Sequence, residues 1–306
     1  MRQIRETGMG YQGASIRGVT IGLVQANCTS SLEENLHRAS LGVHEAASKG
    51  AQIVCLPELF GSLYFCQKQD PVLFDLAEPI PGPSSEVLAK AAKTHGVVLI
   101  SSLFERRAPG LYHNTALVHG PDGALLGTYR KMHIPDDPLF YEKYYFTPGD
   151  LGFKAIDTPF GKIGVLVCWD QWYPEAARLT ALAGAQILFY PTAIGWHPAE
   201  RAEFGADQLA AWQLAQRAHA LASGVFVAAI NRHGHEGDPE GGITFWGHSF
   251  VSDPFARMLV DAPANEDACV IQYCDLGLIE ETRRNWPFLR DRRVDAYGGI
   301  TSRFGN

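Results

Sequence analysis

Apolar and polar positions divide the chain into short segments with two different periods. Short apolar runs, many of them β-branched, predict strands over residues 19–25, 53–56, 97–104, 114–119, 124–130, 163–167, 187–190, 225–230, 245–251, 258–260 and 268–273. Apolar residues at helical spacing predict helices over residues 32–49, 85–95, 174–184 and 204–223. Strands and helices interleave from one end to the other, which indicates an α/β protein.

The strands also indicate how the layers are stacked. Several strands are apolar on both faces, or nearly so, which requires other layers on both sides of the sheet. There are more strands than one helix-covered sheet needs, so we expect two sheets packed together with helices outside. No linker, low-complexity tract or clear repeat interrupts the pattern. We predict one domain over residues 19–306, preceded by a polar lead-in over residues 1–18.

Composition and charge exclude several classes of protein. The chain has 306 residues, a formal net charge of −7 and a sequence pI of about 5.9. This charge gives no electrostatic basis for binding nucleic acid or an anionic membrane. No apolar run approaches the roughly twenty residues of a membrane-spanning helix, and residues 1–18 lack the apolar segment of a secretory signal. We therefore expect a cytoplasmic protein.

The six cysteines are scattered and form no CxxC pair. In a reducing compartment we expect free thiols, most of them small core residues. Cys168 differs because it ends the apolar run 163–167 and closely precedes the helix at Pro174. Such a position faces the crevice in which α/β proteins bind ligands, and nearby N–H groups can lower the pKa of a thiol. Cys168 is a candidate nucleophile, although position alone leaves a core cysteine as the alternative.

Two further ionisable residues occupy comparable positions, and a third lies in an aromatic segment. Glu58 follows a second apolar strand, where burial suits a carboxyl to general acid–base catalysis. Lys131 follows the second strand of a predicted hairpin, where a fixed ammonium favours a thiolate and stabilises an oxyanion. Glu142 lies in the aromatic segment 141–146, which indicates a pocket wall, with an exposed surface Glu as the alternative. A Glu, a Lys and a Cys at three strand ends indicate a catalytic site more specifically than any one of them alone.

Signatures of other catalytic classes are absent from the sequence. There is no HExxH motif, no zinc-type Cys/His spacing and no glycine-rich phosphate loop. Segment 247–250 lacks the second glycine of a serine nucleophile elbow. The segment 233–235 contains two histidines, but it lies in a loop rich in Gly, Asp and Pro. We therefore expect a solvated turn there and no metal site.

Three segments of the sequence resemble a known family. The segments are 56–60, 129–135 and 167–178, and they occur in the order found in the nitrilase superfamily of carbon–nitrogen hydrolases. The resemblance runs from about residue 19 to about residue 297. It implies a four-layer αββα sandwich, homo-oligomers built by packing such sandwiches, no cofactor and a Glu–Lys–Cys site. The family's catalytic residues, including its second glutamate, fall on Glu58, Lys131, Cys168 and Glu142.

Within the superfamily, the chain is most similar to the N-carbamoylputrescine amidases. The similarity rests on segments 64–67, 133–136, 142–146, 148–150 and 189–195. It implies a small-molecule substrate, an N-carbamoyl amine of polyamine biosynthesis. The residues expected to contact this substrate are Tyr64, Trp169, Ile194 and Trp196. The chain departs from these relatives at segment 196–200, Met132 and Asp137, which leaves the exact substrate open.

These assignments define a mechanism and its rivals. We expect Cys168, with Glu58 as general base, to attack the ureido carbon and form a thioester that water cleaves. Lys131 and the N–H of Trp169 would hold the oxyanion, and Asp137 or Glu200 would bind the substrate amine. The rivals are a β-ureidopropionase-like or aliphatic amidase activity, which needs a cationic group for a carboxylate substrate, and a catalytically silent ligand-binding protein. A metal-dependent amidohydrolase is a more remote rival.

Overall fold

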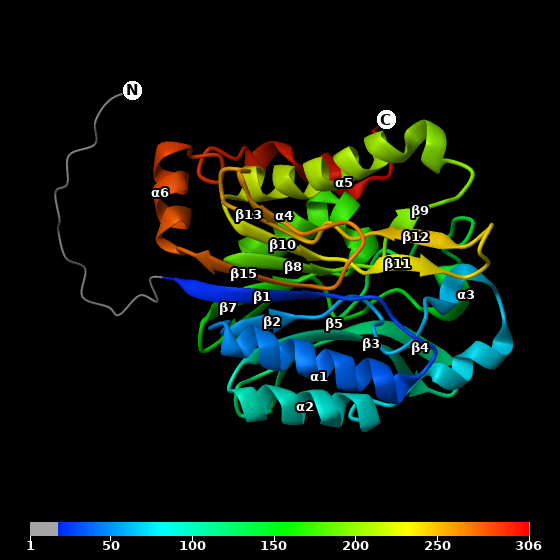
Figure 1. The fold of residues 1–306 in the computed structure, drawn as a ribbon. Helices are drawn as coiled ribbons and strands as arrows, with labels where there is room; N and C mark the ends of the chain where they lie inside the picture. The colour runs from blue at the N-terminus through cyan, green and yellow to red at the C-terminus, as the bar shows by residue number, and fades with distance from the viewer. Residues whose placement is uncertain (1–17, 306) are drawn as a thin grey trace.

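A computed structural model describes residues 18–305 of the chain. The lead-in predicted over residues 1–18 lies outside this part, apart from Gly18. The described chain contains two six-stranded sheets and one three-stranded sheet, with helices on the outside (Figure 1). The six cysteines are free thiols, as predicted. No helix within residues 18–305 is long and apolar enough to cross a membrane.

The first sheet has the strand order β15-β1-β2-β3-β4-β5. Its three central strands β1, β2 and β3 are parallel, and the other pairs are antiparallel. Helices α1 and α2 pack on its outer face, and Ser31 begins α1 by accepting a hydrogen bond from the backbone N–H of Glu34. The bounds are β1 (Val19–Gln25), α1 (Leu32–Ser48), β2 (Ile53–Cys55), α2 (Pro83–His95), β3 (Val98–Ala108), β4 (Leu111–His119), β5 (Leu125–Arg130) and β15 (Ala268–Cys274).

The second sheet has the order β14-β13-β10-β8-β7-β6. β7, β8 and β10 are parallel, and the remaining pairs are antiparallel. Helices α4 and α5 cover the outer face of this sheet (Figure 1). The bounds are β6 (Ala155–Thr158), β7 (Gly161–Val165), α4 (Pro174–Leu182), β8 (Ile187–Pro191), α5 (Arg201–Ser223), β10 (Phe226–Ile230), β13 (Phe250–Ser252) and β14 (Met258–Asp261).

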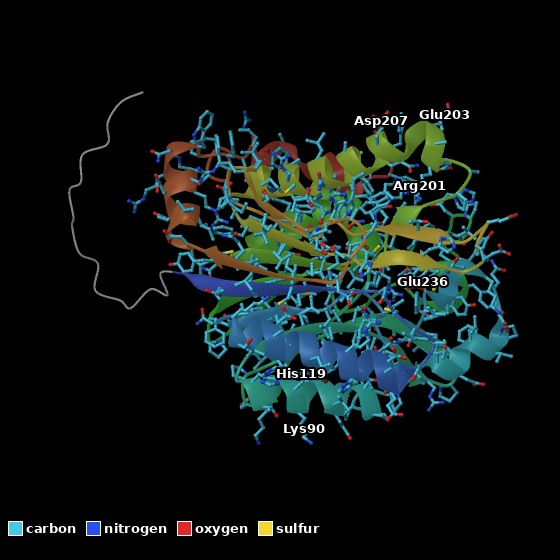
Figure 2. The ribbon with its side chains drawn as sticks, viewed as in Figure 1. Lys90, His119, Arg201, Glu203, Asp207 and Glu236 are labelled. Carbon is cyan, nitrogen blue, oxygen red and sulfur yellow. The ribbon has the colours of Figure 1, made fainter. Side chains whose placement is uncertain are left out.

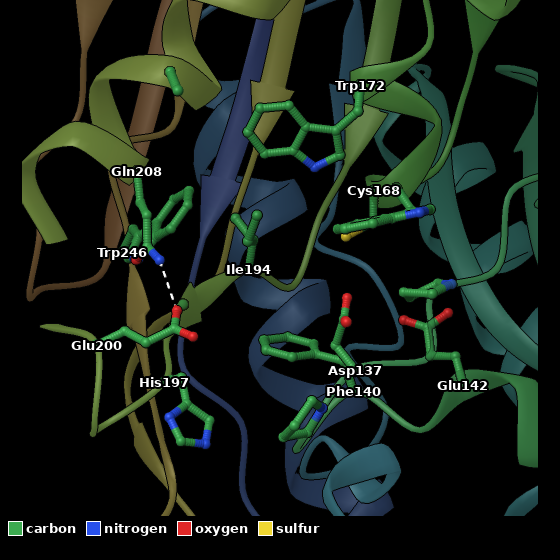
Figure 3. A pocket seen from close by; sticks show the side chains of 15 residues that line it. Asp137, Phe140, Glu142, Cys168, Trp172, Ile194, His197, Glu200, Gln208 and Trp246 are labelled. Carbon is green, nitrogen blue, oxygen red and sulfur yellow. Dashed lines mark hydrogen bonds between the residues drawn. The ribbon is translucent and has the colours of Figure 1, made fainter. Parts of the chain in front are cut away.

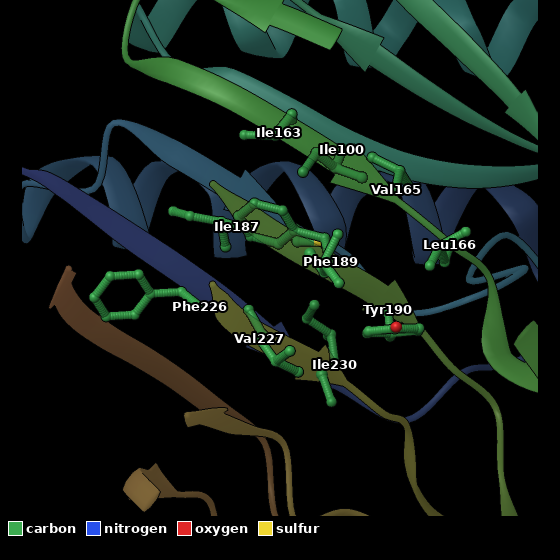
Figure 4. Packing of buried hydrophobic residues seen from close by; sticks show 14 of the residues in the cluster. Ile100, Ile163, Val165, Leu166, Ile187, Phe189, Tyr190, Phe226, Val227 and Ile230 are labelled. Atoms are coloured by element: carbon green, nitrogen blue, oxygen red, sulfur yellow. The ribbon is translucent and has the colours of Figure 1, made fainter. Parts of the chain in front are cut away.

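The inner faces of the two sheets form the main core. Figure 4 shows Ile100 of β3 beside Ile163 and Val165 of β7. Leu99, the neighbour of Ile100, belongs instead to the cluster beneath α1 and α2, because successive strand residues point to opposite faces. Each such fully buried aliphatic side chain contributes about 1.5–3 kcal/mol. The predicted four-layer αββα sandwich is confirmed.

The prediction of one strand over residues 245–251 is wrong. Gly247 and His248 have φ values of +63° and +52°, so the chain turns between β12 (Ile243–Trp246) and β13. The two strands belong to different sheets. The turn was not predicted because apolar residues stand on both sides of Gly247 and His248, and they are buried in both strands.

The prediction of a solvated turn at residues 233–235 is also wrong. These residues form most of β11 (His233–Glu236), and His233 is buried with its Nε2 2.7 Å from Asp267 Oδ1. β11 pairs with β12, which pairs with β9 (Gly195–Trp196). Within residues 18–305, no group of three or more His, Cys, Asp or Glu side chains is placed to hold a metal ion. The strand β6 and the helices α3 (Glu142–Tyr145) and α6 (Gly277–Asn285) were not predicted either.

Candidate active site

Cys168 lies in a strained turn beyond the carboxyl end of β7. The strand ends at Val165, two residues earlier than predicted, and Cys168 begins a short 3-10 helix, Cys168–Trp172. Its φ is +44°, a value that residues with a side chain rarely adopt and that surrounding structure must hold. Asp170 helps to hold it by accepting the backbone N–H of Val167 at 2.9 Å. The turn therefore presents the sulfur in a fixed direction.

Glu58, Lys131 and Glu142 come together in one buried cluster. Lys131 Nζ lies 2.8 Å from Glu58 Oε1 and 2.6 Å from Glu142 Oε2. All three side chains are at most 1% exposed. Glu58 follows β2, Lys131 follows β5 and Glu142 begins α3 (Glu142–Tyr145), so separate segments supply the charges. An isolated buried charge is costly, and this proximity lets the Lys131 ammonium compensate the carboxylates.

Three polar side chains around this cluster fix its carboxylates. Asn114 Nδ2 donates to Glu58 Oε1 at 2.7 Å, and Ser102 Oγ donates to Asn114 Oδ1 at 2.7 Å. The Tyr64 hydroxyl donates to Glu142 Oε1, also at 2.7 Å. Neither Asn114 nor Ser102 was predicted from the sequence. A polar Asn at the start of the apolar run 114–119 was the available signal.

Burial and neighbouring charges set the protonation states. Burial lowers the pKa of Lys131, but Glu142 and Glu58 outweigh it and hold that pKa well above its usual range. Burial raises the pKa of Glu142 to about 7, against the effect of Lys131. Burial, followed by the charge of Glu58, raises the pKa of Cys168 well above its usual range. The predicted lowering of this thiol pKa is therefore wrong, and Cys168 rests as a neutral thiol.

A neutral thiol needs a base before it can attack. Glu58 Oε1 is occupied by Lys131 and Asn114. Glu58 Oε2 is buried and has no hydrogen-bond partner among the described residues. This oxygen can accept a proton inside the cluster. Lys131 donates two hydrogen bonds to the carboxylates, and its third N–H could donate to a developing oxyanion.

A cavity of about 460 Å³ opens onto Cys168 (Figure 3). Glu142 reaches its wall, and so do Trp169 and Ile194, two of the four residues predicted to contact substrate. The complete lining is Pro135, Asp137, Pro138, Phe140, Glu142, Cys168, Trp169, Trp172, Ile194, Gly195, His197, Glu200, Gln208, Ala211 and Trp246. Asp137 and Glu200, the two candidates for binding an amine, are both in this lining.

Tyr64 and Trp196, the other two predicted substrate contacts, lie one layer behind this wall. Tyr64 is 1% exposed, and its hydroxyl supports Glu142. Trp196 donates from Nε1 to the carbonyl oxygen of Gly205 at 2.9 Å and packs against Trp246, which lines the cavity. Both residues therefore shape the wall, and a direct contact of either with substrate stays a prediction.

Asp170 connects the turn at Cys168 to the segment around Lys131. Its completely buried carboxylate accepts the Tyr129 hydroxyl at 2.7 Å and the backbone N–H of His133 at 3.0 Å. Tyr129 and His133 flank Lys131 two residues before and after it. One side chain thus fixes Cys168 relative to Lys131. This role was not predicted, although Asp170 is a charged residue just after an apolar strand.

Comparison with known proteins places this geometry in context. A family model described as carbon-nitrogen hydrolase matches residues 20–284. The chain is 43% identical over 288 residues to an N-carbamoylputrescine amidase of Solanum lycopersicum, covering 92% of this chain and 94% of that protein. It is 38% identical over 287 residues to a citrullinase of Francisella tularensis, covering 94% of this chain and 99% of that protein. The crystal structure of a carbon-nitrogen hydrolase from Helicobacter pylori G27 superposes with a TM-score of 0.91 at 46% identity, covering 94% of this chain and 100% of that one.

Proposed function

The chain belongs to the carbon–nitrogen hydrolase family, whose members cleave non-peptide carbon–nitrogen bonds, and from this premise we propose that it hydrolyses N-carbamoyl amines. The specific substrate we propose is N-carbamoylputrescine, with putrescine, ammonia and carbon dioxide as products. This reaction would place the enzyme in polyamine biosynthesis. The similarity to named N-carbamoylputrescine amidases supports the proposal.

The observation that carries the proposal is the charge of the cavity wall. Asp137 and Glu200 line the cavity, and no Lys or Arg is among its lining residues in the described part of the chain. Figure 3 shows Glu200 on the side opposite to Cys168, held by Gln208 at 2.8 Å. A ureido group at Cys168 would therefore leave a distal ammonium facing carboxylates. The rival substrate N-carbamoyl-β-alanine would bring a carboxylate to the same wall, where like charges disfavour it.

The proposed reaction begins with proton transfer from the Cys168 thiol to Glu58. The sulfur forms a bond to the ureido carbon, and the carbonyl electrons move to the oxygen, which Lys131 and the N–H of Trp169 would stabilise. The intermediate collapses as Glu58 returns its proton to the leaving nitrogen. A carbamoyl-type thioester remains on Cys168. Water, deprotonated by Glu58, then attacks this carbon, the thiol is released, and the resulting carbamic acid decomposes.

Citrulline is a second candidate substrate. The chain is similar to a citrullinase, and citrulline presents the same ureido group together with an ammonium that Asp137 or Glu200 could receive. Its carboxylate has no Lys or Arg partner among the lining residues that the structure describes. We therefore expect citrulline to be a poorer substrate than N-carbamoylputrescine.

The deciding experiment is ammonia release from N-carbamoylputrescine, citrulline and N-carbamoyl-β-alanine at matched concentrations. We expect strong preference for N-carbamoylputrescine, and loss of turnover in folded Cys168→Ala. Cys269→Ala removes another thiol, at the edge of the first sheet, and is the matched control. Preference for the β-alanine compound contradicts the substrate assignment. Turnover by Cys168→Ala contradicts the nucleophile, and absence of any turnover together with ordinary thiol reactivity favours the ligand-binding rival.

A further inference from the structure

We propose that the buried ion pair between Arg232 and Glu236 is a positioning device for the two carboxylates of the site, Glu58 and Glu142. This inference rests on the proposed function, which gives those carboxylates their catalytic roles. Arg232 lies just after β10, and Glu236 ends β11. The pair therefore comes from a part of the chain that supplies none of the Glu, Lys and Cys groups described above.

Arg232 holds the Glu58 segment by its backbone. Its side chain is completely buried. Nη2 donates to the carbonyl oxygens of Glu58 and Leu59 at 2.8 and 2.7 Å, and Nη1 donates to that of Ser62 at 3.1 Å. Leu59 has a φ of +49°, a conformation that persists only where surrounding contacts impose it. The guanidinium therefore fixes the turn that directs Glu58 toward Lys131.

Glu236 extends the same device to Glu142. Its Oε1 accepts Arg232 Nη1 at 2.8 Å, and its Oε2 accepts the backbone N–H of Tyr64 at 2.6 Å. The hydroxyl of Tyr64 then donates to Glu142 Oε1 at 2.7 Å. A continuous chain of hydrogen bonds thus runs from Arg232 through Glu236 and Tyr64 to Glu142. Figure 2 labels Glu236 close to β11.

The chemistry of the pair suits positioning better than stabilisation. Removing two charges from water offsets much of their attraction, so a buried pair adds little stability compared with apolar residues of the same size. Apolar residues, however, cannot bind the four acceptors around Arg232. The planar guanidinium offers five N–H donors in fixed directions, whereas lysine offers a single nitrogen. The pair therefore supplies directed hydrogen bonds at the place where the Glu58 turn is strained.

The first test is Arg232→Lys, which keeps the positive charge and replaces the planar guanidinium with a single ammonium nitrogen. We expect kcat to fall about tenfold or more while KM stays within about threefold, because a small misplacement of a catalytic group costs rate rather than binding. Arg283→Lys is the matched control, since Arg283 also donates to a backbone carbonyl, that of Ser223, but from α6. The control should keep its kcat. Unchanged kcat in folded Arg232→Lys overturns the proposal.

Glu236→Gln tests the second half of the device if Arg232→Lys does not fold. The glutamine has the same shape, but its NH₂ group must face one of the two N–H donors that Glu236 accepts. Tyr64 then shifts, and Glu142 loses a donor to its ionised form. We expect lower kcat at neutral pH that recovers partly at higher pH. A lowered melting temperature with an unchanged pH profile would assign the pair a structural role only.

A measurement without substrate separates this inference from the proposed function. Alkylation of Cys168 by iodoacetamide is followed by peptide mass spectrometry, with Cys269 as the internal reference. Slower alkylation of Cys168 in Arg232→Lys than in Arg283→Lys supports positioning, even if the wild type hydrolyses none of the three ureido compounds. Equal alkylation in the two variants, with the wild type active on N-carbamoylputrescine, overturns the positioning role alone.

Discussion

Removal of the Tyr64 hydroxyl should change the pH dependence of the enzyme. Tyr64→Phe deletes only the group that donates to Glu142 Oε1 at 2.7 Å. Burial already raises the pKa of Glu142 to about 7, and a donor to the carboxylate opposes that rise. Burial, with a further contribution from Glu142, raises the pKa of Tyr64 well above its usual range. The hydroxyl is therefore a donor throughout the neutral range.

The size of the effect follows from this one hydrogen bond. A hydrogen bond to a charged group contributes about 1.5–3 kcal/mol, and one pKa unit corresponds to about 1.4 kcal/mol. Loss of the bond should raise the pKa of Glu142 by about one to two units, from about 7 to about 8–9. The carboxyl is then largely protonated at neutral pH and no longer pairs with Lys131. Activity at neutral pH should fall about tenfold and recover as the pH rises.

The assay is kcat/KM over the neutral and alkaline range for the wild type, Tyr64→Phe and Tyr145→Phe. Tyr145→Phe is the matched control, because this hydroxyl belongs to the same aromatic cluster but donates to the carbonyl oxygen of Lys68 at 2.6 Å. The apparent pKa on the acid side of the kcat/KM profile should rise only in Tyr64→Phe. A shift below about half a unit, or an equal shift in Tyr145→Phe, refutes the reasoning.

Other perturbations test the remaining assignments. Glu142→Gln should lower kcat and leave Tm nearly unchanged. A lower Tm with normal activity would make the role of Glu142 structural. Glu200→Gln and Asp137→Asn should each raise KM for N-carbamoylputrescine about fivefold, since an exposed ion pair contributes up to about 1 kcal/mol; Glu203→Gln, which lies on α5 outside the lining, should not. Chelators should leave the rate unchanged, whereas loss restored by zinc would favour the metal-dependent rival. Light scattering should show a homo-oligomer, because apolar residues such as Leu214, 65% exposed, lie on the outer helices.

The layers of the fold could be predicted from the sequence because the strand pattern carries them directly. Leu99 faces the helices and Ile100 faces the other sheet, so a strand that is apolar on both faces reports layers on both sides. The assignment of a strand to a sheet could not be predicted in the same way. The turn at Gly247 and His248 separates strands of two sheets inside the segment that was predicted as one strand, and strand partners are set by contacts far apart in sequence.

The active-site groups could be predicted only where the residue type itself suggests chemistry. Glu58, Lys131 and Cys168 stood out as ionisable residues at strand ends, and the structure brings the first two within 2.8 Å. Arg232 follows the strand 225–230 in the same manner, but its role depends on carbonyl groups contributed by another segment. The direction of the Cys168 pKa shift was predicted wrongly for a related reason. It depends first on the burial of the thiol and then on the carboxylates that approach it from separate segments, and local sequence shows neither.

The charge of the buried cluster explains why the proposed mechanism uses an internal base for Cys168. Glu58, Glu142 and Lys131, when ionised, carry a net charge of −1. Loss of the thiol proton to solvent would add a second uncompensated negative charge in a medium of low dielectric constant, which is consistent with the raised pKa of Cys168. Transfer of that proton to Glu58 moves one negative charge from oxygen to sulfur and leaves the total unchanged. In the proposed mechanism, accurate placement of Glu58 is therefore the condition under which the Cys168 thiolate forms, and the hydrogen bonds from Asn114 and Arg232 contribute to that placement.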